Sequence, residues 1–485
     1  MKKLLCLLLC LCMLVPALAS CKSEKEGKVA KAQPKDSIVT DDITFPGETF
    51  TILCREDNSF GDYEYEISAD EGSTDVVNQA VYQRNRDVCD IYGLTEIKPI
   101  AVAGDWAAQS NYINKFRNSI DAGLGEFDLL MSQCAYMASG ELAQYFYDFY
   151  KVDYIKDHLN EDFFYQDFIN EMTINGELRY MVGDYSLTYY DHTYVMYFNK
   201  KMAEEYALED IYQLVKDGKW TIDKCMEMAR GKWKDNNNNN WSKEDPDDSF
   251  GYITDIPNTT DSWSAQFDVL PTTKEEGAIK IGYDVGKVTS ILEKMIDFFA
   301  TDDVYAHYSV STDTVEQNPL ESIFKEGRAL FYHATLKEAA AFRSMDIDFG
   351  IVPAPKWNET QTKYMTSAQN GYSSASVPAD VKNVKKCGAI FASLTQESNR
   401  TVIPAYYDQA LKYKFTRDDA SAEMLDIIRD GFTLNFGMFY CETLDCAGIF
   451  RECMAGDGNK AFANFQQARL PGWENNLDEL LKYYD

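Results

Sequence analysis

Hydrophobic and polar positions divide the first 43 residues into distinct stretches. Lys2 and Lys3 precede an apolar run at residues 4–15, and small residues follow at 16–20. This order is typical of a secretory signal, and the run is too short to span a bilayer as a stable helix. Residues 22–42 contain no aromatic side chain and are mostly polar or small, so they predict a flexible tether. We therefore expect a signal segment at 1–20, a tether at 21–43 and a folded body from residue 44.

Strand and helix patterns alternate through the first part of this body. Residues 50–54 form a β-branched and aromatic run after a Pro-Gly turn, which predicts a strand. Ser73 is then expected to cap a helix whose apolar positions recur at helical spacing up to Gly93. Residues 94–100 and 127–132 predict further strands, and residues 105–122 predict the helix between them. This alternation is typical of an α/β lobe built around a mostly parallel sheet.

The pattern continues through the rest of the chain with more varied elements. The dipeptide Asn175-Gly176 predicts a hairpin turn between two short strands. The other expected strands are a long β-rich stretch at 189–198 and short strands at 329–332 and 349–352. The expected helices lie at 200–206, 220–228, 288–299, 423–428 and 477–484. No later segment approaches the roughly 20 consecutive apolar residues of a membrane span.

Composition narrows the class of partner. The 485 residues carry a formal net charge of −31, with 32 Tyr and 27 Phe. Nucleic-acid binding needs basic patches, so this balance argues against nucleic acid as a partner. It equally argues against docking on anionic lipid by charge.

Twelve cysteines suggest neither a metal site nor a dense disulfide framework. Four of them fall within the first 21 residues. The remaining eight are Cys54, Cys89, Cys134, Cys225, Cys387, Cys441, Cys446 and Cys453. There is no C-x-x-C pair or Cys/His cluster, so zinc is not expected. We expect mostly buried free thiols, with Cys441 and Cys446 as the pair that could form a disulfide.

The end of the signal segment carries a resemblance of its own. Leu18-Ala19-Ser20-Cys21 resembles the lipobox of bacterial lipoproteins. The resemblance implies that Cys21 receives a diacylglyceryl group and becomes the first mature residue, on the extracellular face of the cell membrane. The alternative is a plain signal peptide in which this cysteine is accidental.

Several further motifs together resemble the extracellular solute-binding proteins of bacterial ABC importers, in the carbohydrate group that includes maltose-binding proteins. The motifs are FDLL at 127–130, NG at 175–176 with GDYSL at 183–187, VMYFNKKM at 195–202, DGKWT at 217–221, FKEGRAL at 324–330 and DFGIVPAP at 348–355. The resemblance implies a two-lobed α/β fold of the periplasmic-binding-protein-like type II, with a ligand cleft between the lobes.

The same resemblance divides the chain into segments. Lobe 1 would comprise residues 44–180 and 371–440, and lobe 2 would comprise 181–370. The chain would cross between them at 179–188 and 370–376, and C-terminal helices at 441–485 would pack near the hinge.

A sugar site needs aromatic rings for the apolar sugar faces and carboxylates or amides for the hydroxyls. The stretch 184–192 offers both beside the expected hinge, Trp263 lies in a polar segment, and other polar side chains follow expected strands. The candidate ligand-binding residues are Glu56, Asp57, Tyr136, Asp184, Tyr185, Tyr189, Asp191, Trp263, His333 and Tyr372. The structural alternative is that the tyrosines pack the lobe interface, Trp263 covers a helix and His333 is a hydrogen-bonded core residue.

The Asn/Asp-rich loop at 235–248 is a candidate calcium site, because related proteins often carry a calcium loop before a Phe-Gly or Tyr-Gly pair. Its oxygen ligands would be Asp235, Asn237, Asn239, Asp247 and Asp248. Asn240 stands where such loops have a glycine, and the spacing to an acidic final ligand is not kept. A solvated asparagine-rich loop is the favoured interpretation, and no other cofactor is expected.

These observations predict a membrane-anchored receptor, not an enzyme. It would bind a small solute, most plausibly a sugar or oligosaccharide, and deliver it as a monomer to an ABC permease. No nucleophile elbow, P-loop or H-E-x-x-H motif occurs. A lipid-anchored glycosidase and a glycan-tethering lipoprotein without a transporter are the alternatives.

Overall fold

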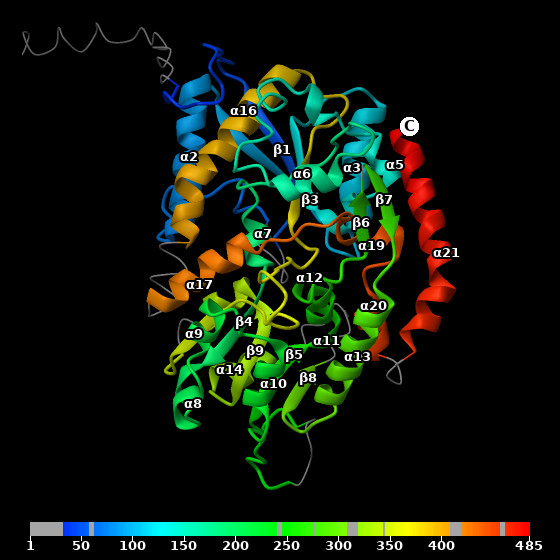
Figure 1. Cartoon of the computed structure of the whole chain (residues 1–485). Helices are drawn as coiled ribbons and strands as arrows, with labels where there is room; N and C mark the ends of the chain where they lie inside the picture. Colours follow the sequence, from blue (N-terminus) through cyan, green and yellow to red (C-terminus); the bar gives the residue numbers. More distant parts are fainter. Residues whose placement is uncertain are drawn as a thin grey trace, which may run out of the picture.

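A four-stranded sheet forms the centre of the first lobe, in the upper half of Figure 1. Its strands are β1 (Thr49–Arg55), β2 (Glu96–Val102), β3 (Leu129–Gln133) and β11 (Ser373–Ser376), in the order β11-β3-β1-β2. The first three run parallel, and β11 joins β3 in antiparallel register. In this computed structural model the described residues are 33–57, 63–239, 245–275, 277–307, 319–342, 345–407, 419–455 and 461–485. The signal segment and Cys21 lie outside them. The folded body begins before the expected residue 44, because Ile38 and Val39 are buried and Arg400 pairs with Asp36.

Helices cover both faces of this sheet. The first-lobe helices are α2 (Val76–Tyr92), α3 (Gln109–Asp121), α4 (Cys134–Met137), α5 (Gly140–Ala143), η2 (Phe149–Lys151), α6 (Gln166–Met172), α16 (Val384–Glu397) and η5 (Ser398–Val402). The cap of α2 differs from the prediction. Asp75, not Ser73, accepts the hydrogen bonds of Val77 N and Asn78 N, while Gly93 ends the helix at a positive φ of 71° as expected.

A five-stranded mixed sheet forms the centre of the second lobe. Its strands are β4 (Tyr194–Asn199), β5 (Phe250–Asp255), β8 (Val304–His307), β9 (Ala329–Thr335) and β10 (Phe349–Val352), in the order β10-β4-β9-β5-β8. The surrounding helices are α8 (Lys200–Glu205), α9 (Ile211–Lys216), α10 (Ile222–Ala229), α11 (Ile256–Thr259), η3 (Thr260–Ser262), α12 (Trp263–Gln266), α13 (Val285–Phe299), α14 (Pro319–Lys325), η4 (Leu336–Glu338) and α15 (Ala339–Phe342). A separate hairpin of β6 (Thr272–Glu275) and β7 (Ala278–Ile281) leaves this lobe toward the first.

Two predictions for short elements near the lobe junction are wrong. Asn175 and Gly176 do form a turn with positive φ angles of 48° and 82°, but only the single bridge Ile174–Glu177 closes it, without flanking strands. The stretch 189–198 is not continuous β structure, because α7 (Leu187–Asp191) precedes β4.

The C-terminal part of the chain lies beside both lobes. Its helices are α17 (Asp419–Asp430), α18 (Phe436–Phe439), α19 (Cys441–Leu444), α20 (Ile449–Ala455), α21 (Phe462–Leu481) and η7 (Lys482–Tyr484). Helix α17 packs on α9 and β10 of the second lobe. Helix α21 contacts α13 of the second lobe and α5 of the first, and in Figure 1 it runs along one side of the molecule past both.

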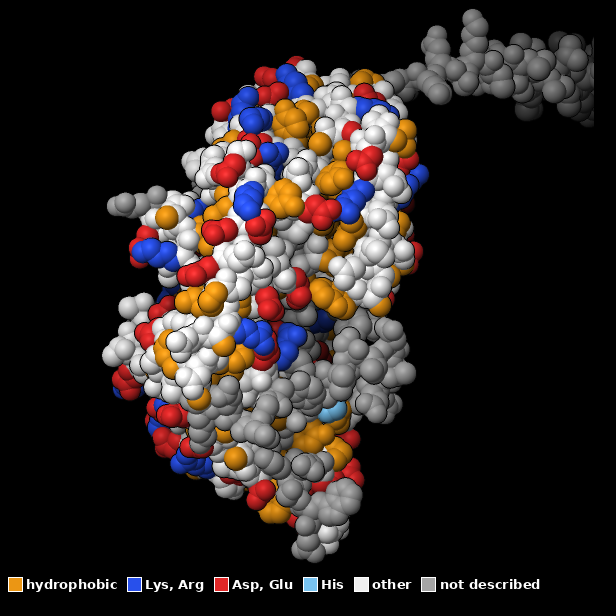
Figure 2. Space-filling model, turned by 90° about the vertical axis from the view of Figure 1, so that its right-hand side faces the viewer, with side chains coloured by type: hydrophobic (Ala, Val, Ile, Leu, Met, Phe, Trp, Pro, Cys, Tyr) orange, Lys and Arg blue, Asp and Glu red, His pale blue; other side chains and the backbone are white. Residues whose placement is uncertain are grey.

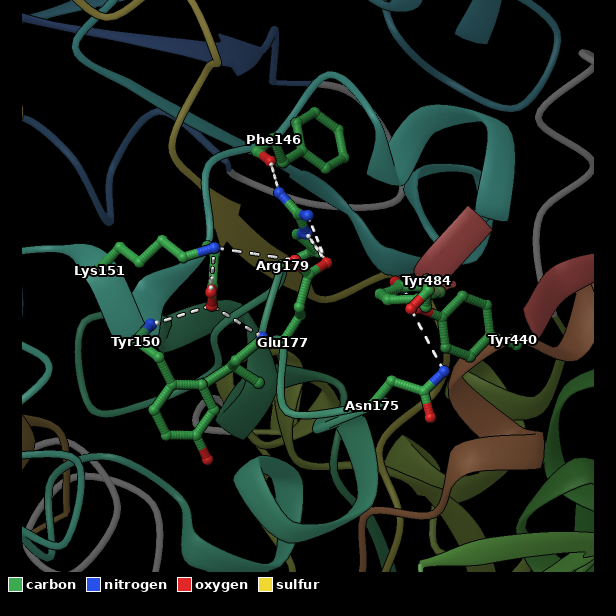
Figure 3. A network of polar contacts seen from close by, with 10 residues as sticks. Phe146, Tyr150, Lys151, Asn175, Glu177, Arg179, Tyr440 and Tyr484 are labelled. Atoms are coloured by element: carbon green, nitrogen blue, oxygen red, sulfur yellow. Dashed lines mark hydrogen bonds and ion pairs between the residues drawn. The ribbon is translucent and has the colours of Figure 1, made fainter. Parts of the chain in front are cut away.

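The chain end docks against the Asn175 turn of the first lobe (Figure 3). Asn175 Nδ2 donates to Tyr484 O at 3.2 Å, and the Tyr484 and Tyr440 hydroxyls are 2.7 Å apart. Beside this contact, Arg179 pairs with Glu177 and donates to the carbonyl of Phe146. Helix α21 is thereby attached at its C-terminal end to the first lobe.

The surface that carries α21 has no single dominant kind of side chain. Figure 2 views this side and shows acidic, basic and apolar groups interspersed, with charged side chains gathered at mid-height. Across the described residues, no helix combines the length and hydropathy that crossing a bilayer requires.

The eight cysteines after residue 50 are all free thiols, so the possible Cys441–Cys446 disulfide is not formed. Six of the eight are buried, in agreement with the expectation of core thiols.

Candidate functional site

Two chain segments cross side by side between the lobes. Met181 N donates to Ala375 O and Ala375 N to Met181 O, both at 2.9 Å. Farther along, Gln369 N donates to His192 O at 2.8 Å and Tyr194 N to Ser367 O at 3.0 Å. This antiparallel pairing joins the sheet of one lobe to the sheet of the other, so ligand-dependent changes in lobe angle would act on it.

A cavity of about 250 Å³ lies beside these crossings. Its walls come from the junction of α7 and β4, from residues 367–372 of the second crossing, from Asp261 of the second lobe and from residues 433–452 of the C-terminal part. Clefts between lobes are where ligands of α/β proteins preferentially bind.

Tyrosines form the aromatic wall of the cavity. The rings of Tyr189 and Tyr372 meet edge to face, with centroids 4.9 Å apart, and Phe432 meets Tyr189 in the same way at 4.8 Å. Tyr189 and Ser367 are both buried, and their hydroxyls have no hydrogen-bond partner among the described residues. Because an unpaired buried hydroxyl is costly, each of these groups would gain free energy from a polar partner that reaches it.

Charged side chains form another wall. A carboxylate oxygen of Asp261 pairs with the guanidinium of Arg451, while Asp261 Oδ1 is buried without a partner among the described residues. Burial raises the pKa of Asp261 to about 6, although Arg451 partly offsets this effect. Burial also raises the pKa of the neighbouring Glu442.

A family model described as bacterial extracellular solute-binding protein matches residues 100–410, which is more than half of the chain. The chain belongs to this family. The cavity wall at 433–452 lies beyond the matched residues, so this solute-binding protein builds part of its candidate site from a segment that the family match does not include. Comparison with curated proteins finds no match.

Solved structures agree with this membership at the level of the fold. The galacto-N-biose/lacto-N-biose I-binding protein of an ABC transporter from Bifidobacterium longum, in complex with lacto-N-biose, matches with a TM-score of 0.54 and 14% identity over 89% of this chain and 98% of that one. A cyclo/maltodextrin-binding protein in complex with maltotetraose matches with a TM-score of 0.53 and 10% identity, over 90% of this chain and 97% of that one. An ABC transporter solute-binding protein from Agrobacterium radiobacter K84, in complex with ribitol, matches with a TM-score of 0.52 and 13% identity, over 90% of this chain and 99% of that one. The two-lobed α/β fold is therefore confirmed.

Of the ten residues proposed from the sequence as ligand contacts, Tyr189 and Tyr372 line the cavity of the solute-binding protein. Asp184, Tyr185 and Asp191 lie close by but are engaged within the protein. Asp184 accepts hydrogen bonds from Tyr190 and Tyr165, and Asp191 accepts them from Tyr65 and Tyr406. Tyr185 Oη accepts a hydrogen bond from Ala375 N at 3.0 Å.

Trp263 is predicted as a ligand contact because it lies in a polar segment of the sequence. In the structure this residue is part of the core. It begins α12, is 1% exposed and packs against the rings of Phe267, Phe299 and Phe450. The short helices η3 and α12 turn its indole inward and leave the preceding Asp261 at the cavity.

The remaining candidates lie away from this cavity. Glu56 and Asp57 are exposed after β1, where Asp57 Oδ1 accepts the hydrogen bond of Glu64 N at 2.7 Å. Tyr136 is buried and donates to Gly104 O at 3.0 Å. His333 is buried with Nδ1 3.2 Å from the Tyr252 hydroxyl, and burial lowers its pKa to about 3, so its imidazole is neutral.

The proposed calcium loop is held by its own side chains. Asp248 is fully buried and accepts hydrogen bonds from Trp233 Nε1 and Asn236 N. Asn237 and Asn239 both donate to Asp245 Oδ2. No group of three His, Cys, Asp or Glu side chains suited to a metal occurs in the described part of the chain, and residues 240–244 of the loop lie outside it. Calcium binding by Asp235, Asn237, Asn239, Asp247 and Asp248 stays a prediction.

Sequence reasoning missed the charged wall. Asp261 and Arg451 are 190 residues apart, and Arg451 and Glu442 stand on short helices of the C-terminal part. No local sequence pattern identifies any of these three residues as part of a site, because only the fold brings them together.

Proposed function

We propose that this protein is an extracellular receptor that binds a small saccharide in the cavity between its lobes and passes it, as a monomer, to an ABC permease. The observation that carries the proposal is the cavity itself, which is lined both by tyrosines and by an aspartate–arginine pair. Apolar sugar faces stack on aromatic rings, and sugar hydroxyls both donate to carboxylates and accept from guanidinium groups.

Two further properties support a small saccharide. The unpaired hydroxyls of Tyr189 and Ser367 supply hydrogen-bonding groups that the protein itself does not use. The cavity volume is just below the range of about 300–1,000 Å³ typical of ligand pockets, which favours a short sugar over a long polymer. Structural neighbours hold lacto-N-biose and ribitol.

We also propose binding without hydrolysis, and delivery through lobe closure. Family membership favours a binding role. A ligand that contacts both Asp261 of the second lobe and the crossing residues would favour the closed arrangement, which a permease could then distinguish from the open one.

A thermal-shift screen against mono- and disaccharides tests the binding proposal. A sugar present at 100 times its Kd should stabilise the protein by about 2.7 kcal/mol and should be recovered chemically unchanged. If no sugar raises the melting temperature, the saccharide assignment is wrong. If the sugar is cleaved, the glycosidase alternative replaces it.

The variant Tyr189→Phe locates the site. It removes only a hydroxyl that has no partner among the described residues, so the free protein should keep its stability. Sugar affinity measured by calorimetry should fall by about fivefold, the equivalent of one hydrogen bond of roughly 1 kcal/mol. Glu474→Gln, at an exposed position of α21, is the matched control and should leave affinity unchanged.

We further propose that Cys21 carries a lipid anchor and that residues 22–35 act as the tether, since Val39 is buried in the first lobe and Arg400 pairs with Asp36. A tether keeps the receptor at a high effective concentration near its permease without fixing its orientation. Acyl chains supply the membrane affinity that a chain of charge −31 cannot obtain from anionic lipid.

Cys21→Ser is expected to move the protein from the membrane fraction into the medium while its sugar affinity stays the same. Immunoblots of the two fractions, with calorimetry on the released protein, measure both properties. If the parent protein is itself found in the medium, the plain signal-peptide alternative replaces the anchor. Retention of the Cys21→Ser protein in the membrane fraction would show that attachment does not depend on Cys21.

A further inference from the structure

The cavity contains more carboxylates than cationic groups. Its lining includes Asp261, Glu442, Asp445 and Glu452, against Arg451 as the one Lys or Arg that lines it among the described residues. Arg451 pairs with Asp261. Arg469 of α21 forms ion pairs with two of the other carboxylates. Its guanidinium lies 3.5 Å from the carboxylate of Asp445 and 2.5 Å from that of Glu452.

Glu442 makes no ion pair with a described residue, although Arg451 is near enough to affect its titration. Among the described residues, four carboxylates thus share two guanidinium groups, so negative charge is in excess there. Asp255 adds to the negative potential at Asp261. Burial is the main cause of the raised pKa of both Asp261 and Glu442; Arg451 opposes the shift and neighbouring carboxylates add to it.

The unpaired carboxylate oxygen of Asp261 favours a hydrogen-bond donor on the ligand, whereas the hydroxyls of Tyr189 and Ser367 can bond either a donor or an acceptor. Asp261 Oδ1 is buried and can only accept while the group is ionised. An ammonium group offers three donors and a positive charge, whereas a hydroxyl offers one donor and no charge. A carboxylate or sulfate offers only acceptors and a like charge, which a cavity lined by carboxylates disfavours.

We infer that the cavity selects its ligand by charge, with Asp261 and Glu442 as the residues that determine this specificity. It binds saccharides that carry a free amino group in preference to neutral ones, and it rejects those that carry a uronic carboxylate. The inference rests on the proposed function, because it assigns a ligand class to the same cavity.

Two matched sugar series test this selection by calorimetry at low salt. One comprises glucosamine, glucose and glucuronate, and the other galactosamine, galactose and galacturonate. Within the series that fits the site, the amino sugar should bind at least tenfold tighter than the neutral sugar, and the uronate at least tenfold weaker. The preference should narrow as salt is raised, since ions screen the partly open cavity.

Glu442→Gln identifies the source of the selection. Glu442 is exposed and without an ion pair to a described residue, so the variant should fold normally. The ratio of amino-sugar to uronate affinity should fall by about tenfold. Glu474→Gln removes the same charge from a remote face of α21 and should leave the ratio unchanged, which separates a local effect from one of total charge.

The outcomes distinguish the inference from the proposed function. If the neutral sugar or the uronate binds as tightly as the amino sugar, charge selection is wrong while saccharide binding stands. If Glu442→Gln and Glu474→Gln change the ratio equally, the cavity carboxylates are not its source. If no member of either series binds while another sugar of the thermal-shift screen does, charge selection is wrong and saccharide binding stands.

Discussion

Asp184→Ala is expected to lower the free energy of unfolding by about 3–5 kcal/mol, the usual cost of breaking a buried charged network. The carboxylate is fully buried at the start of the first crossing. Its Oδ1 accepts hydrogen bonds from Tyr190 at 2.9 Å and Tyr165 at 3.1 Å. Its Oδ2 accepts one from Asn399 Nδ2 at 2.7 Å and lies 3.6 Å from Arg429.

The size of the effect follows from what alanine leaves behind. The partners of Asp184 come from the residue before α6, from α7, from η5 and from α17, so a single carboxylate joins four segments around the lobe junction. Its removal leaves two phenols and an amide without their buried acceptor. The more conservative Asp184→Asn keeps the volume and is expected to cost less, about 1–3 kcal/mol.

Urea unfolding at pH 7 measures both variants, with Glu474→Ala as an exposed control that should stay within about 0.5 kcal/mol of the parent. An Asp184→Ala protein as stable as this control would mean that the junction does not depend on the carboxylate.

The second large effect is a pH dependence that comes from Glu66. Its side chain is 1% exposed, and its Oε2 accepts hydrogen bonds from Thr188 N and Thr188 Oγ1 at 3.1 and 3.0 Å. Burial raises its pKa from 4.5 to about 7, and hydrogen bonds from Ser373 and Thr188 offset this only in part. The nearby guanidinium of Arg84 donates to the backbone oxygens of Glu66 and Ile67, so it does not neutralise the carboxylate directly.

The folded protein therefore holds a proton on Glu66 that the unfolded chain releases between pH 4.5 and 7. This contribution to stability is complete below pH 4.5 and is lost as the pH rises through 7. At about 1.4 kcal/mol per pKa unit, the loss amounts to about 3 kcal/mol.

Glu66→Gln should remove this dependence, because the amide is neutral at every pH and keeps an oxygen for Thr188. The stability of the variant relative to the parent should rise by about 3 kcal/mol between pH 4.5 and 8, as measured by urea unfolding across that range. For the control Glu474→Gln, the difference in stability from the parent should not change with pH. Parallel pH curves for the parent and Glu66→Gln would show that Glu66 is not the titrating group.

The elements that the sequence predicts well are those with one buried face. Helix α13 shows its apolar positions at helical spacing, and β1 has a clear turn before it, so local pattern and final structure agree. Helix α16 escaped prediction because its residues from Lys386 to Gln396 are buried on every side, which leaves no periodic contrast between an apolar and a polar face.

Long-range packing accounts for the other differences. Tyr189 and Tyr190 have the aromatic character of a strand, yet both are fully buried in α7 between the crossings. Trp263 is flanked by polar residues in the sequence, but its partners Phe299 and Phe450 come from distant helices. In the candidate site, the motifs at the crossing pointed to Tyr189 and Tyr372, whereas Arg451 and Glu442 depend on the C-terminal fold.

The position of β11 in the first sheet sets an order for folding. Its neighbour β3 ends at Gln133, and the contact of Cys134 Sγ with Asn370 O joins positions 236 residues apart. A nascent chain therefore exposes β3 as an open edge while the whole second lobe is still being made. Until Ser373 to Ser376 arrive, the free N–H and C=O groups of β3 can pair with any extended chain, so the synthesis of the second lobe is the interval in which aggregation has to be prevented.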